Sequence, residues 1–254
     1  MIEVQGLSKR FGDLQVLTDI SATFEKGKIN QIIGMSGSGK SVLAKCMVGL
    51  HKPDEGRVLY EGQSFHEMSE IERREIRKEI GMLFQGSALF DSMTVLENVM
   101  FPLTMFAKMP RSEMVDQAHS CLQRVKIIDK DDLYPAEISG GMQKRVGIAR
   151  AIAMNPKYLF VDEPNSGLDP RTSIVIDELI LELTKEFNTT TVVITHDMNS
   201  VMGIGENIIF IHKGRKWWHG DRDGLLRSDN PELNDFIFAG SLMREVKRAM
   251  TSGS

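Results

Sequence analysis

The clearest chemical feature of the sequence is a loop rich in glycine and serine, at residues 34–41. It reads Gly34-Met35-Ser36-Gly37-Ser38-Gly39-Lys40-Ser41 and lies between a β-branched run and an apolar helical pattern. Glycines let backbone N–H groups converge on phosphate oxygens, and the N-terminus of the following helix adds a positive dipole end. The pattern therefore predicts a phosphate-binding loop, in which Lys40 reaches the β- and γ-phosphates and the Ser41 hydroxyl binds Mg²⁺.

Two carboxylates, Asp162 and Glu163, directly follow the apolar run of residues 158–161. This run predicts a buried strand that delivers both carboxylates to its C-terminal end. One carboxylate can hold the Mg²⁺ shell, and the next can polarise the water that attacks a phosphate. Because many strands end in this pair of residues, its meaning depends on the phosphate-binding loop upstream.

A second predicted anion site is the helix start at Ser139-Gly140-Gly141. Ser139 is a good N-cap, and the two glycines leave the first backbone N–H groups bare. An ordinary capped helix would explain the same three residues. The other motifs of the chain favour the anion site.

The elements that must position these residues form an alternating β/α chain. Asp169 followed by Pro170 predicts another helix start, because these residues are favoured at the N-cap and at the first helical position. Helical patterns without clear strands predict a helical insertion at about residues 86–154. Apolar and β-branched runs predict strands at residues 1–7, 14–24, 28–34, 57–60, 80–84, 158–161, 191–195, 207–212 and 216–219.

The composition excludes several classes of protein. The 254 residues carry a formal net charge of -4, with 26% charged and 41% hydrophobic residues, which is typical of a globular domain. The slightly acidic balance argues against a nucleic-acid-binding protein. No apolar run is long enough for a membrane span, and the N-terminus has no signal-peptide pattern. Cys46 and Cys121 stand far apart, which suits a reducing cytoplasm.

The order of the motifs identifies a family. The phosphate loop, Ser139-Gly140-Gly141, Asp162-Glu163, Ser166-Gly167-Leu168-Asp169 and a lone His196 after a strand together resemble the nucleotide-binding subunit of an ATP-binding-cassette (ABC) protein. The resemblance covers nearly the whole chain. It implies an α/β P-loop NTPase with a RecA-like core, an N-terminal antiparallel β subdomain and the inserted α-helical subdomain. The ABC ATPase domain would cover residues 1–240, with a C-terminal tail at 241–254.

The resemblance also implies roles for single residues. Phe11 would stack on adenine, and Gln85 would meet Mg²⁺, the attacking water and the membrane partner. Glu163 would be the catalytic base, and His196 would contact the γ-phosphate. Phe11 could instead be a core residue, and Asp169 can also serve as a helix cap. The predicted ATP-binding set is Phe11, Gly34, Met35, Ser36, Gly37, Ser38, Gly39, Lys40, Ser41, Ser139, Gly140, Gly141 and Asp169, and the predicted metal ligands are Ser41, Gln85 and Asp162.

The same resemblance implies a homodimer of ATPase subunits. In this family the helix start at residues 139–141 closes over ATP that is held by the Lys40 side of a second copy. Two ATP molecules with Mg²⁺ would then lie at a two-fold interface, which nucleotide holds closed and hydrolysis opens.

A finer resemblance is to ATPase subunits of lipid transporters of the Mla type, which have MCE-domain partners. It rests on residues 83–92, 97–99 and 139–146, and on Met142, which stands where the wider family has glutamine. The sequence departs from the wider family also at Ile138, where leucine is usual, and at Asn165, where threonine is commoner. The chain would lie peripherally at the cytoplasmic face of the inner membrane, drive two permease subunits and move phospholipid.

Other interpretations remain open. An importer ATPase for a small solute such as an amino acid would share this chemistry, and so would a regulatory cassette that does not transport. Residues 100–106 are predicted to be the edge that contacts a partner helix, although the insertion's own core could explain their apolar character. One of Trp217 and Trp218 should pack, residues 70–79 should form a solvated helix face, and Leu242, Val246 and Met250 give the tail an amphipathic pattern.

Overall fold

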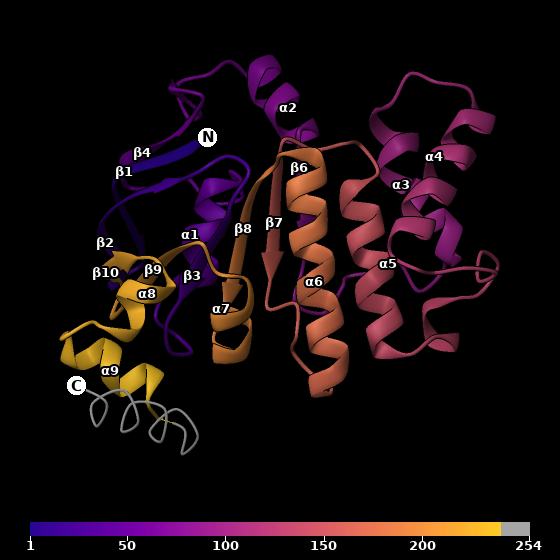
Figure 1. Ribbon diagram of the computed structural model, residues 1–254. Helices are drawn as coiled ribbons and strands as arrows, with labels where there is room; N and C mark the ends of the chain where they lie inside the picture. Colours follow the sequence, from indigo (N-terminus) through magenta and orange to yellow (C-terminus); the bar gives the residue numbers. More distant parts are fainter. Residues whose placement is uncertain (240–254) are drawn as a thin grey trace. The chain divides into compact units, whose positions relative to one another are not determined.

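A computed structural model describes residues 1–239 of the chain, so the predicted tail at 241–254 lies outside the described residues. The chain forms two compact units, each with its own sheet elements and helices (Figure 1). Among the described residues, the first unit contains 1–25, 30–66 and 194–239, and the second contains 26–29 and 67–193.

The N-terminal part of the first unit is an antiparallel sheet in the order β2-β1-β4-β5. Its strands are β1 (Ile2–Phe11), β2 (Leu14–Phe24), β4 (Glu55–Tyr60) and β5 (Gln63–Ser64). The strand expected to end at residue 7 continues to Phe11, because the hairpin keeps pairing up to Phe11 and Leu14. Alternation along β1 buries Ile2 and Val4 on one face.

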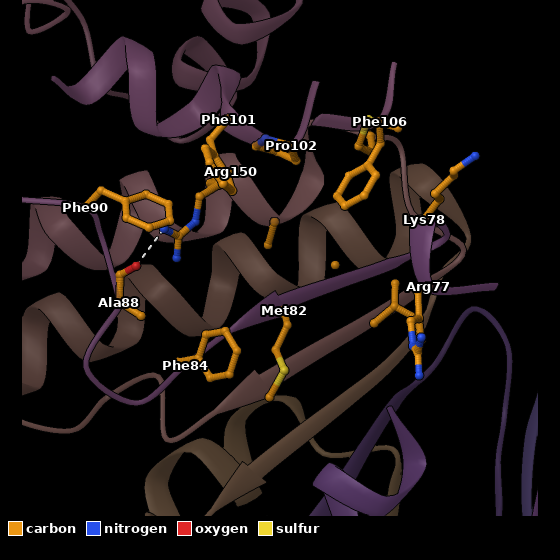
Figure 2. A pocket seen from close by; sticks show the side chains of 14 residues that line it. Arg77, Lys78, Met82, Phe84, Ala88, Phe90, Phe101, Pro102, Phe106 and Arg150 are labelled. Atoms are coloured by element: carbon orange, nitrogen blue, oxygen red, sulfur yellow. Dashed lines mark hydrogen bonds between the residues drawn. The ribbon is translucent and has the colours of Figure 1, made fainter. Parts of the chain in front are cut away.

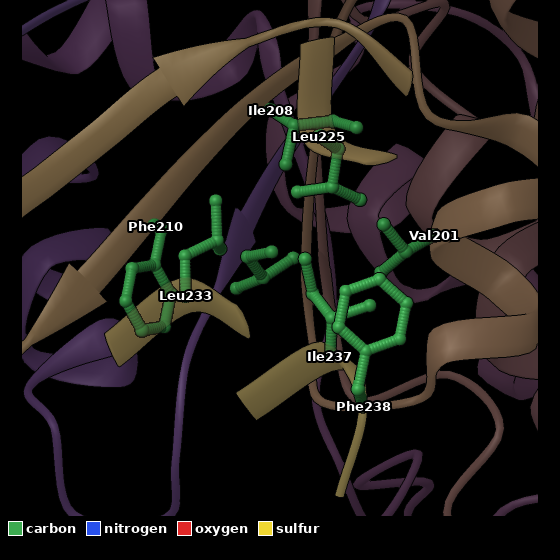
Figure 3. Close-up of a cluster of buried hydrophobic side chains, with 8 residues drawn as sticks. Val201, Ile208, Phe210, Leu225, Leu233, Ile237 and Phe238 are labelled. Atoms are coloured by element: carbon green, nitrogen blue, oxygen red, sulfur yellow. The ribbon is translucent and has the colours of Figure 1, made fainter. Parts of the chain in front are cut away.

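A second set of strands in the first unit places β9 (Asn207–His212) between β10 (Arg215–Gly220) and β3 (Ile29–Ile33). β9 is antiparallel to β10 and parallel to β3. The helices α1 (Lys40–Met47), α7 (Met198–Ile204), α8 (Arg222–Leu226) and α9 (Pro231–Ile237) belong to the same unit. Ile33, Val201, Phe210, Leu225 and Leu233 are among the side chains of its buried core (Figure 3).

Trp218 packs against this core, whereas Trp217 is 39% exposed. The expectation that one of the two packs is therefore confirmed. The helix that follows the phosphate-binding loop, α1, ends at Met47, because the amides of Leu50 and His51 turn back to the Lys45 carbonyl oxygen. Leu50, beyond this end, is 58% exposed.

The second unit holds the strands β6 (Ile80–Leu83) and β7 (Tyr158–Asp162) and the first part of β8 (Thr190–Thr195). β7 lies between β8 and β6 and is parallel to β6. All five residues of β7 are buried. A continuous apolar run of this kind is what a strand in a parallel sheet requires, because both faces are covered.

Helices make up the rest of the second unit. They are α2 (Glu70–Lys78), α3 (Val95–Phe106), α4 (Arg111–Arg124), the 3-10 turn η1 (Pro135–Glu137), α5 (Gly140–Ile152) and α6 (Pro170–Phe187). α3, α4 and α5 pack against one another, and residues 86–154, all of which are described, contain no strand (Figure 1). α2 buries none of its residues, which confirms the solvated face expected there.

The helices α5 and α6 begin where the sequence predicts them to begin. Ser139 is the N-cap of α5, and Asp169 is the N-cap of α6 with Pro170 at the first helical position.

Both cysteines are buried, Cys46 in α1 and Cys121 in α4, and burial raises the pKa of each thiol to about 11.

Candidate functional site

The phosphate-binding loop leaves the buried strand β3 and enters α1 through two glycines with positive φ. Gly34 has φ 150° and Gly39 has φ 103°. A Cβ on Gly34 would lie 2.2 Å from the Ile211 carbonyl oxygen and 2.9 Å from Ser38 Oγ. Only glycine fits both the backbone angle and the space there, so the neighbouring strand β9 fixes the path of the loop.

Lys40 is 6% exposed and points back over this loop. Its Nζ donates to the carbonyl oxygens of Gly34, at 2.9 Å, and of Met35, at 3.0 Å. The ammonium group is therefore held above the loop that it is predicted to serve. Met35, Ser36 and Gly37 form the exposed tip of the loop.

The start of α1 fits a phosphate group. Its N-cap residue, Gly39, offers no side chain to accept the first-turn N–H groups, which need an acceptor from outside the helix. Ser38 Oγ is buried and finds no hydrogen-bond partner among the described residues. In contrast, α5 and α6 both begin with a side-chain cap. An anion at the start of α1 would satisfy these donors.

Two further predicted residues belong to the first unit. Phe11 is 43% exposed, so it is not a core residue. Its ring meets the edge of His51, with centroids 5.2 Å apart, and Lys9 Nζ lies 5.3 Å from its centroid. His196 is an exposed residue just after β8. The next residue, Asp197, caps α7 by accepting from the Asn199 amide at 2.9 Å, which fixes the turn that carries His196.

The carboxylates of the second unit stand where the sequence predicts them. Asp162 ends β7 and is 9% exposed. Glu163 follows with φ 48°, in the left-handed region that residues other than glycine seldom adopt.

Asn165 Nδ2 donates to Asp177 Oδ1 of α6 at 3.0 Å. This bond gives a structural role to an asparagine for which the sequence alone offered none.

Gln85 lies in an exposed loop after β6. The loop is bent by two residues with positive φ, Ser87 at 61° and Ala88 at 47°. It is held by α5, since Arg150 donates to the carbonyl oxygens of Ser87 and Ala88, both at 2.7 Å, and Lys144 donates to that of Gln85. Neither Lys144 nor Arg150 stands out in the sequence, because the carbonyl oxygens that they bind belong to distant segments.

The helix starts of α5 and α6 lie against each other. A Cβ on Gly141 would stand 2.7 Å from Thr172 Cγ2, whereas a Cβ on Gly140 would meet no atom within 4 Å. Asp169 Oδ1 accepts from the amides of Arg171, at 3.0 Å, and Thr172, at 3.1 Å. Hydrogen bonds from the Thr172 hydroxyl and amide lower the pKa of the Asp169 carboxyl. The capping role of Asp169 is thus confirmed.

The predicted residues therefore fall into two groups. Phe11, the loop at residues 34–41 and His196 belong to the first unit, and the other predicted residues to the second. Ser41, Gln85 and Asp162 each carry an oxygen atom of the kind that Mg²⁺ prefers as a ligand. In the described part of the chain, no three His, Cys, Asp or Glu side chains gather at one point.

Comparisons with known proteins agree with these motifs. Residues 17–166 match the family model of the ABC transporter. A probable ribonucleotide transport ATP-binding protein, mkl of Mycobacterium leprae, is 37% identical over 93% of this chain and 68% of its own length. The methionine import ATP-binding protein MetN 1 of Rhodococcus jostii is 41% identical over 92% of this chain and 70% of its own.

This chain thus spans about two thirds of the length of these relatives. Among solved structures, a dimeric ATP-binding cassette in a post-hydrolysis state, bound to ADP and Pi, superposes with a TM-score of 0.79. It is 32% identical and covers 87% of this chain and 98% of its own. Together with the phosphate-binding loop and the start of α1, which has no side-chain cap, these matches show that the chain belongs to the ABC transporter family. It is an ATP-binding subunit that hydrolyses ATP.

Proposed function

We propose that this ATPase subunit powers phospholipid trafficking across the cell envelope, through separate permease subunits and an MCE-domain lipid-binding partner. The observation that carries the lipid assignment is Met142 at the end of the Ser139-Gly140-Gly141 segment, together with residues 83–92. Both resemble Mla-type ATPases more than the wider family. The chain itself would supply the energy and would not touch the lipid.

The site residues take the following proposed roles. Residues 34–41 cradle the phosphates of ATP, Lys40 neutralises the β- and γ-phosphates, and Phe11 stacks on adenine. Glu163 accepts a proton from the attacking water, and His196 contacts the γ-phosphate. The exposed ring of Phe11 and the unpartnered hydroxyl of Ser38 support these assignments.

Mg²⁺ fits beside the phosphates, with Ser41, Gln85 and Asp162 as its protein ligands. When bound, the ion neutralises charge on the phosphate oxygens. Ser139, Gly140, Gly141 and Asp169 would act on ATP held by a second copy of the chain. The open space at Gly140 supports this, since no protein atom of its own chain would fill it. So does the dimeric state of the similar solved cassette.

A groove in the second unit supports the permease partner (Figure 2). Its volume is about 400 Å³, and aromatic side chains from two segments face into it, among them Phe84, Phe90 and Phe106. The rings of Phe90 and Phe101 are in contact, with centroids 4.6 Å apart and planes tilted by 52°. The Arg150 guanidinium lies 5.9 Å from the Phe90 centroid. Met100, expected at this edge, is instead 3% exposed, because it faces the core of the helical bundle.

The charges of the groove indicate the chemistry of its occupant. Arg77, Lys78 and Arg150 line it, and no acidic side chain is among the described lining residues. Burial lowers the pKa of Arg150, so its cation is poorly solvated and would gain from a carboxylate nearby. We propose that a short amphipathic helix of the permease, with an acidic residue on its apolar face, binds here.

The membrane partners give the test of this function. Affinity purification in detergent, followed by mass spectrometry, should recover a permease and an MCE-domain protein. Phe106→Asp should lose both, because Phe106 is a 43% exposed groove residue. The control Ile128→Asp changes an apolar residue that is 65% exposed outside the groove and should lose neither.

A second candidate is an importer ATPase for a small solute. The methionine import relative, at 41% identity, favours it. Recovery of a solute-binding protein in place of an MCE-domain protein would support this candidate and refute the lipid assignment. If no membrane protein came with the chain, a regulatory cassette would be the better explanation. Within residues 1–239, no helix has the length and apolar character of a membrane span.

A further inference from the structure

Lys144 is a buried lysine one turn into α5. It is 5% exposed, although lysine is rarely buried without partners. Its ammonium group donates to the main-chain carbonyl oxygen of Gln85 and, at 3.4 Å, to that of Glu163. One side chain therefore contacts the backbone of two residues that belong to the proposed hydrolytic site.

The backbone at Glu163 needs such support. With φ 48°, Glu163 is in a region that costs free energy for a residue with a Cβ and persists only where the surroundings fix it. Its carbonyl oxygen accepts from the Ser166 amide at 3.2 Å as well as from Lys144. Because these contacts fix the peptide after Glu163, they also limit the directions in which its carboxylate can point.

The same helix holds the loop that carries Gln85. Arg150 binds the carbonyl oxygens of Ser87 and Ala88, and its guanidinium lies beside the Phe90 ring in the groove (Figure 2). Gly147 of α5 allows the close approach, since a Cβ there would be 2.6 Å from Leu83 Cδ1. A partner that moves Phe84 or Phe90 would therefore also move the Gln85 carbonyl group.

The electrostatics agree with a bridging role. Burial lowers the pKa of Lys144, and the charges of Asp162 and Glu163 oppose this shift. A single ammonium group can serve two carbonyl oxygens from different segments, because its three donors point in different directions. Arg145, the next residue, instead donates to Val125 and Lys126, away from the proposed site.

We propose that Lys144 is a positioning residue for ATP hydrolysis, which joins the main chain of the Gln85 loop to the main chain of Glu163. Displacement of the loop by a partner in the groove would then be transmitted to the orientation of the Glu163 carboxylate. This inference rests on the proposed roles of Gln85 and Glu163. It adds a physical connection between the groove and the proposed base.

The test compares three variants of the full chain in steady-state ATP hydrolysis. Lys144→Met keeps the length of the side chain but removes its donors. We expect kcat to fall about 10- to 100-fold, because a displacement of about 1 Å at a reacting group can cost that much. The KM for ATP should stay unchanged, since the two carbonyl oxygens that Lys144 binds are not among the predicted phosphate-binding groups. Lys144→Arg, which restores donors of similar reach, should recover most of the loss.

Arg145→Met is the matched control. It removes a cation that donates to two carbonyl oxygens from the neighbouring position of the same helix. We expect its kcat to stay within about twofold of that of the unchanged protein, even if the substitution lowers the free energy of unfolding. Hydrogen exchange gives a readout that does not depend on activity. Amide hydrogens in peptides that cover residues 84–90 and 162–166 should exchange faster in Lys144→Met than in the unchanged protein. In Arg145→Met their exchange rates should be unchanged.

The outcomes separate this inference from the function on which it rests. A Lys144→Met protein with normal kcat, or with normal exchange in both peptides, overturns the inference while the ATPase assignment stands. Full activity in Glu163→Gln refutes the proposed base itself. If Lys144→Met does not fold, Lys144→Gln replaces it. Glutamine is too short to reach both carbonyl oxygens, so the same loss of kcat is expected, and its absence would overturn the inference.

Discussion

A methyl group added at Gly141 tests how the starts of α5 and α6 fit together. The new Cβ of Gly141→Ala would stand 2.7 Å from Thr172 Cγ2, far inside an ordinary contact. Thr172 cannot simply rotate away, because its hydroxyl donates to Asp169 Oδ2 at 2.5 Å. Overpacking of this kind typically costs about 1–3 kcal/mol. Against this, alanine in place of a helical glycine gains up to about 1 kcal/mol.

The repulsive term should exceed the gain in helix propensity. We therefore expect Gly141→Ala to lower the free energy of unfolding by up to about 2 kcal/mol, the difference between the two effects. Thr172→Ser removes Cγ2 and keeps the hydroxyl that binds Asp169. In that background Gly141→Ala should be neutral or stabilising, so the coupling energy of the double-mutant cycle should be about 1–3 kcal/mol.

Urea unfolding of the four proteins measures this coupling. Gly140→Ala is the control for helix propensity, since a Cβ there meets no atom within 4 Å, and it should not be destabilising. A coupling energy near zero would refute the packing derived for this contact. The ATPase rates of the same proteins are informative too. Recovery in Gly141→Ala/Thr172→Ser would show that close packing against Thr172, and not a contact with nucleotide, is what requires glycine at position 141.

Three further predictions concern the proposed chemistry and the pH dependence of stability. Lys40→Ala should abolish ATP binding, measured by titration calorimetry, and unchanged affinity would contradict the phosphate-loop assignment. Glu163→Gln should still bind ATP and remain a closed dimer in size-exclusion chromatography, while hydrolysis falls about 100-fold or more; turnover at the normal rate would exclude Glu163 as the base. Burial lowers the pKa of His219 from its ordinary value of 6.5. The folded protein then binds fewer protons there than the unfolded chain, so this contribution to stability is complete above pH 6.5 and decreases as the pH falls below it. In urea unfolding, His219→Gln should remove that part of the slope, and an identical slope in both proteins would exclude His219 as its source.

Much of the site could be predicted because its signals are local. The start of α6 follows from Asp169 and Pro170, and the capless start of α1 follows from the glycines before Lys40. The buried strand β7 follows from its apolar run. In each case a few consecutive residues determine the backbone, so the sequence pattern is sufficient.

The features that were missed depend on contacts between distant segments. Met100 is apolar like its neighbours, and only the packing of α3 on α4 and α5 decides that it is buried. Lys144 resembles a surface lysine in sequence, because its carbonyl partners are 59 and 19 residues away. Asn165 donates a hydrogen bond to Asp177, which lies in the following helix, α6. No periodicity within one segment reports such pairings.

The burial of both cysteines has a practical consequence for labelling this protein with a fluorescent dye. At pH 7, a thiol with a pKa of about 11 is ionised in only about one copy in 10,000, and alkylating reagents react with the ionised form. Cys46 and Cys121 should therefore remain unlabelled without being replaced. A single new cysteine at an exposed position such as Leu14, which is 67% exposed, could then carry a fluorescent dye by itself. The proposed opening and closing of the dimer could then be tested on a chain with one substitution.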